Sequence, residues 1–208
     1  MASAETVTEN STQTTPQPGA GIADPGPLGL AGFASTTLAL SLVNAGVVPK
    51  TAELIVLPLA LFFGGIAQLL AGMWEFRKDN TFGATAFTAY GAFWLAFAFL
   101  AWQFLPKIPA TDVGSAVGTF LLVFTIFTAY MTLAALRTNG ALIAVFAVLT
   151  LTFLFLTIGA YAGSDGLSKF GGWLGILTAL LAFYTSAAGI VNGTWKRTVL
   201  PVFPLAGR

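Results

Sequence analysis

Six long apolar segments dominate this 208-residue sequence. They lie near residues 28–48, 54–74, 83–105, 113–136, 140–162 and 170–194, and the breaks between them hold proline, glycine and charged residues. About 20 residues of α-helix cross a bilayer, so each segment is long enough for one crossing. Only 8% of the residues are charged, against about 25% in soluble domains. The sequence therefore predicts an all-α polytopic membrane protein, with a six-helix transmembrane domain over residues 24–197.

The two ends of the chain differ from this apolar body. Residues 1–23 are rich in Thr, Pro, Gln and Ser and contain no Lys or Arg, which predicts a disordered tail and not a signal peptide. Residues 198–208 are expected to form a short C-terminal tail. Six crossings place both tails on one side, together with Arg77, Lys78, Arg137, Lys196, Arg197 and Arg208. The other side has Lys50, Lys107 and Lys169, so we predict cytoplasmic termini in the plasma (inner) membrane.

Missing residue types exclude several chemistries. The chain has no Cys and no His, which removes thiol chemistry, the commonest metal ligand and the usual base near neutral pH. We therefore expect no catalytic residues, no metal, no cofactor and no enzyme activity. The net charge of +1 gives no reason to expect a nucleic-acid partner. Charged residues fall in tails, loops and segment ends, which argues against a pump with an intramembrane carboxylate chain.

Uncharged polar residues are nevertheless frequent inside the apolar segments. Most are expected to serve helix packing, because small residues and hydroxyls allow close helix contacts. A pore lined by neutral donors is the other interpretation, for which the candidates are Thr36, Asn44, Gln68, Thr150 and Tyr184. Gln68 is the sharpest case, since a buried amide is costly without partners, and packing and pathway roles remain equally open for it. Glu75 suits a structural cap or a loop-pairing group better than a translocation carboxylate.

An uncharged pore suits a small solute that is neutral or weakly charged. Moving a bare carboxylate into low dielectric costs on the order of 20 kcal/mol in the idealised limit. A simple carboxylic acid has a pKa of roughly 4 to 5, by analogy with Glu. We therefore predict that any proton coupling is carried mainly by the substrate and that uptake rises at acidic pH.

The entry to the first segment carries a distinctive motif. Its sequence is Asp24-Pro25-Gly26-Pro27-Leu28-Gly29-Leu30-Ala31-Gly32-Phe33. Prolines fit a first helical turn, and the glycines let another backbone or a solute come close.

This motif resembles the N-P-A-P-L-G-L-x-G-F signature of the acetate uptake transporter family, which includes the bacterial succinate–acetate permease and fungal ammonia/acetate exporters. A second stretch, which runs from Gly64-Gly65 through Gln68, Glu75 and Asn80-Thr81 to Tyr90-Gly91-Ala92-Phe93-Trp94, resembles the family's block over helices two and three. Arg197-Thr198-Val199-Leu200-Pro201 resembles the end of the bacterial permease.

The resemblance implies a homohexamer with one anion pathway through each subunit, acetate as the main substrate, and succinate or other small carboxylates in some members. It implies a constriction formed by Phe33, Tyr90 and Leu149, and a link between Ala182 and the size of the carboxylate. An apolar constriction of this kind can gate by excluding water.

One residue departs from the signature. Asp24 stands where the family usually has Asn, and an ionised Asp repels an anion that Asn could bind. Either Asp24 caps the helix and faces away, or its charge is compensated, or the substrate is protonated; we favour capping.

Two other functions are compatible with an uncharged helical bundle. A channel for a neutral solute such as ammonia, urea or water is the main alternative to a carboxylate transporter. A membrane scaffold without a continuous polar path is the other.

Overall fold

A computed structural model describes residues 21–205. Its described part is a helical bundle in which six helical stretches are long and apolar enough to span a membrane. The predicted fold class is thus confirmed. The predicted N-terminal tail lies mostly outside the described residues. The spans are α1 (Gly26–Asn44), the broken second span (Lys50–Arg77), the third span (Thr81–Lys107), α5 (Val113–Ala135), α6 (Gly140–Ala162) and α7 (Asp165–Trp195).

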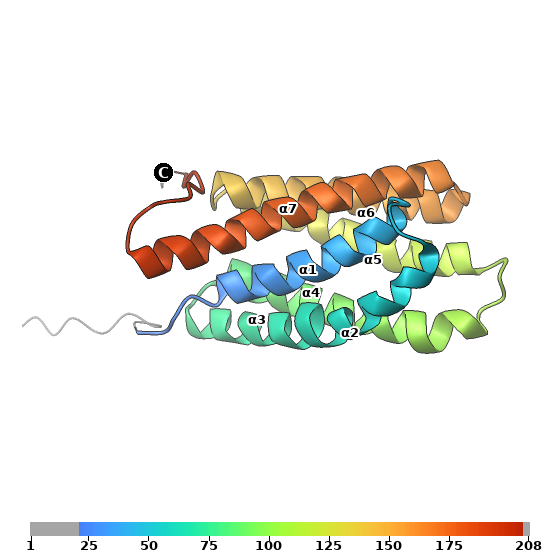
Figure 1. Cartoon of the computed structure of the whole chain (residues 1–208), viewed down its shortest axis with the longest axis horizontal. Helices are drawn as coiled ribbons and strands as arrows, with labels where there is room; N and C mark the ends of the chain where they lie inside the picture. The colour runs from blue at the N-terminus through green and yellow to red at the C-terminus, as the bar shows by residue number, and fades with distance from the viewer. Residues whose placement is uncertain (1–20, 206–208) are drawn as a thin grey trace, which may run out of the picture.

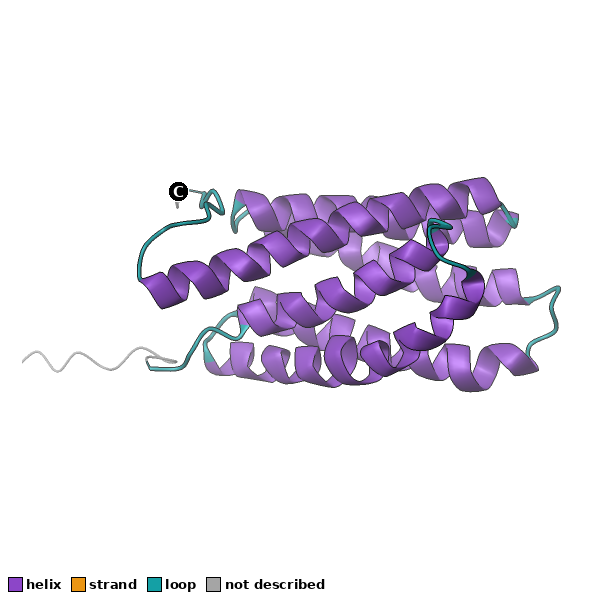
Figure 2. Ribbon diagram, in the orientation of Figure 1, coloured by secondary structure: helices purple, strands orange, loops and turns teal. Residues whose placement is uncertain are grey.

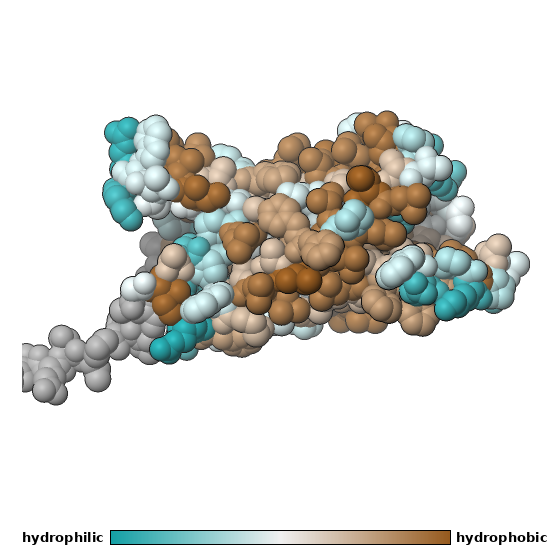
Figure 3. All heavy atoms as spheres, turned by 60° about the horizontal axis from the view of Figure 1, so that its bottom comes forward, coloured by the Kyte–Doolittle hydropathy of each residue, from teal (hydrophilic) through white to brown (hydrophobic). Residues whose placement is uncertain are grey.

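The helices run roughly parallel to the long axis of the molecule (Figure 1). The helix α1 packs mainly against α7 and the second span, while α5, α6 and α7 pack in sequence order. The first described residues and the C-terminal segment lie at the same end of the bundle (Figure 1). In the face shown by Figure 3, apolar side chains cover the middle and polar ones gather at the two ends, as a membrane-spanning bundle requires.

The second span is not a single α-helix. It begins as a 3₁₀-helix, η1 (Lys50–Ile55), continues as α2 (Val56–Leu61), widens into a π-helical turn, η2 (Phe62–Ala67), and ends as α3 (Gln68–Arg77). The third span is α4 (Thr81–Phe99) followed by a π-helical turn, η3 (Leu100–Phe104), and a 3₁₀ turn, η4 (Leu105–Lys107). These spans extend two to four residues beyond each of the predicted limits of 54–74 and 83–105. Hydropathy could not reveal the two π turns, which often occur at functional sites.

Glycines bring α1 against its neighbours at two places. A Cβ on Gly32 would overlap the carbonyl oxygen of Phe63, and one on Gly64 would overlap the Thr36 hydroxyl. A Cβ on Gly172 of α7 would overlap the backbone nitrogen of Ala45. Because even a methyl group does not fit, these contacts require glycine, as expected where helices cross closely in a membrane.

Threonine hydroxyls join α5, α6 and α7. Thr125 and Thr157 lie 3.0 Å apart, Thr132 and Thr150 2.8 Å apart, and Thr152 and Thr178 3.2 Å apart, between hydroxyl oxygens. These hydroxyls also donate to or lie near carbonyls of the preceding helical turn, as Thr125 does to Leu121. The pairs satisfy polar groups inside the bundle and hold the helices together.

After α7 the chain turns back toward the start of α6, as the loop at the end of α7 in Figure 2 shows. Residues 196–205 form this return, which we call the C-terminal strap. The reversal begins at Lys196, whose φ of 53° is left-handed. The strap carbonyls of Phe203 and Val202 accept hydrogen bonds from the backbone nitrogens of Gly140 and Ala141 at 2.9 and 3.2 Å. It therefore satisfies donors that the first turn of α6 would otherwise leave free.

Candidate functional site

Two cavities enter the bundle from opposite ends. The terminus-side cavity, about 270 Å³, opens where α1, α4 and α6 begin. The far-side cavity, about 180 Å³, opens near the loops that follow α1 and precede α7. Phe33 and Leu149 line both cavities. These two side chains therefore form the partition between two hollows that face opposite sides of the spans.

The partition is apolar and packed. Phe33 is 5% exposed and Leu149 3%, and the rings of Phe33 and Tyr90 lie 5.5 Å apart between centroids. The Tyr90 hydroxyl lies 2.8 Å from the Thr128 hydroxyl, so its polar end has a partner. Tyr90 lines the terminus-side cavity. The structure thus brings Phe33, Tyr90 and Leu149 to one level of the bundle, although they come from α1, α4 and α6.

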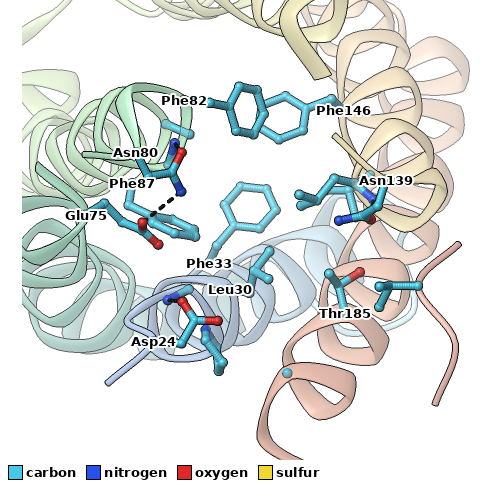
Figure 4. Close-up of a pocket in the computed structure, with 18 of the residues that line it drawn as sticks. Asp24, Leu30, Phe33, Glu75, Asn80, Phe82, Phe87, Asn139, Phe146 and Thr185 are labelled. Atoms are coloured by element: carbon cyan, nitrogen blue, oxygen red, sulfur yellow. Dashed lines mark hydrogen bonds between the residues drawn. The ribbon is translucent and has the colours of Figure 1, made fainter. Parts of the chain in front are cut away.

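The terminus-side cavity has polar side chains at its entrance and aromatic ones deeper in. Figure 4 shows the Phe33 ring between Glu75 and Asn80 on one side and Asn139 and Thr185 on the other. Asn80 caps α4 by accepting from the Gly83 nitrogen at 3.1 Å, and Asn139 caps α6 by accepting from the Leu142 nitrogen at 2.9 Å. Three helices therefore begin at this entrance, and their dipoles favour negative charge there.

Two carboxylates lie at the same entrance. Glu75 is 2% exposed and accepts a 2.8 Å hydrogen bond from the Asn80 amide. Asp24 accepts from the Gly26 nitrogen at 3.2 Å and pairs with the Lys78 ammonium at 3.1 Å. Asp24 thus satisfies a donor of the first turn of α1 and has its charge compensated. It also lines the cavity, so the expectation that a capping Asp24 would face away was wrong.

The far-side cavity is lined by one stripe of α1. Phe33, Thr37, Ser41 and Asn44 follow one another at intervals of four, four and three residues, and all four line this cavity. The spacing places them on one face of a helix. Trp94 of α4 and Thr152 of α6 lie in the same wall. The predicted candidate Asn44 is therefore in a cavity wall.

Buried polar atoms without a hydrogen-bond partner occur mainly at these cavities. Among the described residues they are Thr37 Oγ1, Gln68 Nε2 and Oε1, Thr88 Oγ1 and Trp94 Nε1. Gln68 lines the terminus-side cavity, and Thr37 and Trp94 line the far-side cavity. A buried polar group without a partner costs about 1–3 kcal/mol. Groups of this kind on both sides of the partition are ready to bond a polar solute or water.

Four predicted candidates lie elsewhere, because their side chains have protein neighbours in place of a cavity. Thr36 faces the second span and donates to the Gly32 carbonyl at 3.0 Å. Thr150 pairs with Thr132, and Ala182 is fully buried in the core of the bundle. Tyr184 donates a 2.7 Å hydrogen bond to the Pro201 carbonyl of the C-terminal strap. None of the four lines either cavity of residues 21–205.

The remaining motif residues shape the entrance. Pro25 precedes α1 directly, and Pro27 lies in its first turn. A Cβ on Gly29 would lie 2.6 Å from the Phe87 ring, so glycine at this position allows α4 to pack close to α1. The helix α4 starts at Thr81. These residues position the cavity wall, as the motif suggested.

Sequence reasoning missed several lining residues, including Thr37, Trp94, Asn139, Thr185, Asn192 and Val202. The helical spacing from Phe33 through Thr37 to Asn44 was a usable signal for Thr37. Trp94 gave none, because a tryptophan in an apolar segment ordinarily packs. Val202 belongs to the strap, whose position depends on tertiary contacts.

Comparison with known proteins places these features in a family. The model of the GPR1/FUN34/yaaH family matches residues 7–207. The succinate-acetate/proton symporter SatP of Escherichia coli (strain K12) is 40% identical over 183 residues, which cover 87% of this chain and 95% of that protein. Acetate permease A of Emericella nidulans is 39% identical over 195 residues, covering 86% of this chain and 65% of that protein.

A solved structure agrees with the fold. The structure of the bacterial acetate channel SatP superimposes with a TM-score of 0.80 at 39% identity, covering 87% of this chain and 99% of that chain. The relatives are named as a symporter, a permease and a channel, which confirms the prediction of a transport protein and not an enzyme. This chain is a multi-pass membrane protein that belongs to the GPR1/FUN34/yaaH family.

Proposed function

We propose that this protein carries acetate and other small carboxylates, succinate among them, across the membrane through each subunit. The path runs from one cavity past the partition of Phe33 and Leu149, with Tyr90 beside it, into the other cavity. The observation that carries this proposal is the pair of opposed cavities that share two apolar side chains. The names of the E. coli and E. nidulans relatives and of the solved channel supply the substrate class.

The partition explains how a carboxylate crosses. Its side chains offer no charge and no hydrogen bond, and stripping water from an anion is costly in low dielectric. The protonated acid avoids most of that cost, so the proton travels with the substrate. A dry, narrow partition of this kind passes a small acid and opposes the flow of water and ions.

Gln68 is the proposed stopping point on the terminus side. Its amide nitrogen can donate to a carbonyl oxygen, and its amide oxygen can accept from the hydroxyl of a carboxylic acid. Because both atoms lack protein partners, an acid bound there supplies the hydrogen bonds that the amide does not make within the protein. Thr37 and Trp94 offer donors at the far side. Binding at such sites must stay weak, since conduction requires the solute to leave.

The entrance favours access by anions without trapping them. Helix dipoles of α1, α4 and α6 point positive ends at the terminus-side cavity. Asp24, Asn80, Asn139 and the C-terminal strap already occupy several backbone donors of those helix starts. The helix dipoles therefore favour a carboxylate, the Glu75 carboxylate at the same entrance opposes part of that effect, and few free donors hold the substrate.

The assembly and its orientation are further parts of this proposal. We infer a homohexamer with one path per subunit and cytoplasmic termini in the plasma (inner) membrane, so that the terminus-side cavity faces the cytoplasm. The family resemblance supports the hexamer, and the distribution of Lys and Arg supports the orientation. Native mass spectrometry of the purified protein in detergent tests the subunit number.

Reconstituted vesicles test the function. Uptake of labelled acetate into proteoliposomes should exceed that of empty vesicles and should rise as the external pH falls toward the pKa of acetic acid. Osmotic swelling in urea, measured on the same vesicles, should match that of empty vesicles. Urea permeation without acetate uptake would indicate the neutral-solute channel. A large anion current that does not depend on pH, recorded in a planar bilayer, would contradict passage as the protonated acid.

A further inference from the structure

The C-terminal strap is attached to the bundle at both of its ends. Asn192 of α7 uses its whole side-chain amide on it: Nδ2 donates to the Leu200 carbonyl at 2.8 Å, and Oδ1 accepts from the backbone nitrogens of Val199 and Leu200 at 2.7 and 3.0 Å. Tyr184, two turns earlier on α7, donates to the Pro201 carbonyl at 2.7 Å. These two side chains hold the strap along the end of α7.

The far end of the strap is fixed to α6. Besides the bonds from Gly140 and Ala141, the Leu205 nitrogen donates to the Thr138 carbonyl at 3.4 Å, and Asn139 pairs with Pro204 as an isolated antiparallel bridge. Phe203 is held at a φ of 56°, a left-handed conformation that bulky residues adopt only where their surroundings fix it. The strap is therefore held in one conformation between the end of α7 and the start of α6.

This segment takes part in the wall of the terminus-side cavity. Val202 of the strap, its anchor Asn192 and its neighbour Asn139 all line that cavity. The strap thus closes the cavity entrance on the side of α6 and α7, opposite Glu75 and Asn80 on α3 and α4 (Figure 4).

We propose that the C-terminal strap is a fixed wall that sets the width of the terminus-side entrance, and that Asn192 and Tyr184 are the positioning residues that hold it. The inference rests on the proposed transport path and adds to it a determinant of carboxylate size outside the apolar partition. The Tyr184 side chain thereby acts on selectivity from a distance, although it does not line a cavity.

Removing the anchors tests the wall. We expect Asn192→Leu and Tyr184→Phe to raise the uptake of a bulkier acid, benzoate, relative to acetate by about threefold, since pocket size discriminates between substrates. Tyr130→Phe is the matched control for Tyr184→Phe, because Tyr130 is 52% exposed on α5 and its hydroxyl makes no hydrogen bond within the described residues. Asn192→Asp keeps the two acceptor bonds but sets an oxygen against the Leu200 carbonyl, so its benzoate-to-acetate ratio should lie between those of the parent and Asn192→Leu.

A second readout does not depend on transport. The chain has no cysteine, so Thr185→Cys places a single thiol in the cavity wall. A membrane-impermeant maleimide should label this thiol at least about fivefold faster when Asn192→Leu is added, because that change removes all three hydrogen bonds between the Asn192 side chain and the strap. Unchanged labelling and an unchanged benzoate-to-acetate ratio in the folded variants would overturn the proposal. If labelling is faster but the protein transports no acetate, the strap is a wall of the cavity and the proposed transport function is wrong.

A cross-link separates a wall from a moving lid. The bridged residues 139 and 204 suit a disulfide, because Cα atoms of antiparallel partners lie about 4.5–5.5 Å apart. The double variant Asn139→Cys, Pro204→Cys should carry acetate at the same rate when oxidised and when reduced. Transport that stops on oxidation and returns on reduction would show that the strap must open, which contradicts a fixed wall.

Discussion

The two halves of the bundle, α1 to α4 and α5 to α7, differ in whether buried polar side chains are left without hydrogen-bond partners. In α5, α6 and α7, threonine hydroxyls pair with one another across helices. All the described residues with unpartnered buried polar atoms lie in α1, α3 and α4: Thr37, Gln68 and Trp94 line a cavity, and Thr88 does not. The first pattern stabilises helix contacts, and the second leaves bonding capacity for a solute. The difference teaches that an unpartnered polar atom in a cavity wall, and not polarity alone, marks a candidate pathway residue.

The largest effect is expected at the glycine contacts that bring α1 to the second span. Gly32→Ala forces a methyl group onto the Phe63 carbonyl oxygen, and overpacking of this kind costs about 1–3 kcal/mol. The thermal midpoint of the detergent-solubilised protein should fall, and acetate uptake with it. Gly193→Ala is the control, because a Cβ there meets nothing within 4 Å; it should keep or raise the midpoint. An unchanged thermal midpoint in Gly32→Ala would show that the close contact between Gly32 and Phe63 does not stabilise the protein.

The comparison itself is tested most directly at Gln68. Gln68→Leu replaces an amide of which neither polar atom is satisfied, so the free energy of unfolding should stay the same or rise. Acetate uptake should fall about tenfold, equivalent to about 1.4 kcal/mol. A variant that loses stability but keeps its transport rate would assign Gln68 to packing and would erase the contrast between the halves.

The opposite result is expected at a threonine pair. Thr125 and Thr157 line neither cavity of the described chain, so Thr157→Val should leave acetate uptake within about twofold while it lowers stability by roughly 0.6 kcal/mol, the mean for such bonds in membranes. A double-mutant cycle with Thr125→Val measures the coupling between the two hydroxyls. A coupling energy of zero, or a loss of transport equal to that of Gln68→Leu, would count against hydroxyl pairs as packing devices.

The smallest effect is expected at Asp24. Asp24→Asn keeps an oxygen that can accept from the Gly26 nitrogen and loses the ion pair with Lys78, which is exposed and worth about 0–1 kcal/mol. Acetate uptake at neutral pH should change less than about twofold, because Lys78 already compensates the charge. A several-fold rise in uptake with unchanged stability would mean that Asp24 repels the substrate.

The sequence predicted the parts of the site that follow from motif and periodicity. Phe33 and Leu149 line both cavities, and Tyr90 and Gln68 line the terminus-side cavity. We predicted Thr36 as a lining residue, and not its neighbour Thr37. Successive side chains of an α-helix point about 100° apart, so Thr36 faces the second span and not the cavity. Tyr184 was chosen as a lining residue, but its hydroxyl reaches the strap. These differences come from rotation and long-range contacts that composition does not record.

The sequence by itself determined six membrane-spanning helices, span centres without charged residues and the absence of thiol and imidazole chemistry, because these depend on segment length and residue type. The tertiary structure alone decided which polar groups are satisfied, where the π-helical turn η2 places Gln68, and how residues 196–205 return to cap α6. The physical reason is that a hydroxyl or an amide has the same capacity to bond wherever it occurs in the chain. Only the packing of helices distant in sequence decides whether that group forms its hydrogen bond with another side chain or with a solute.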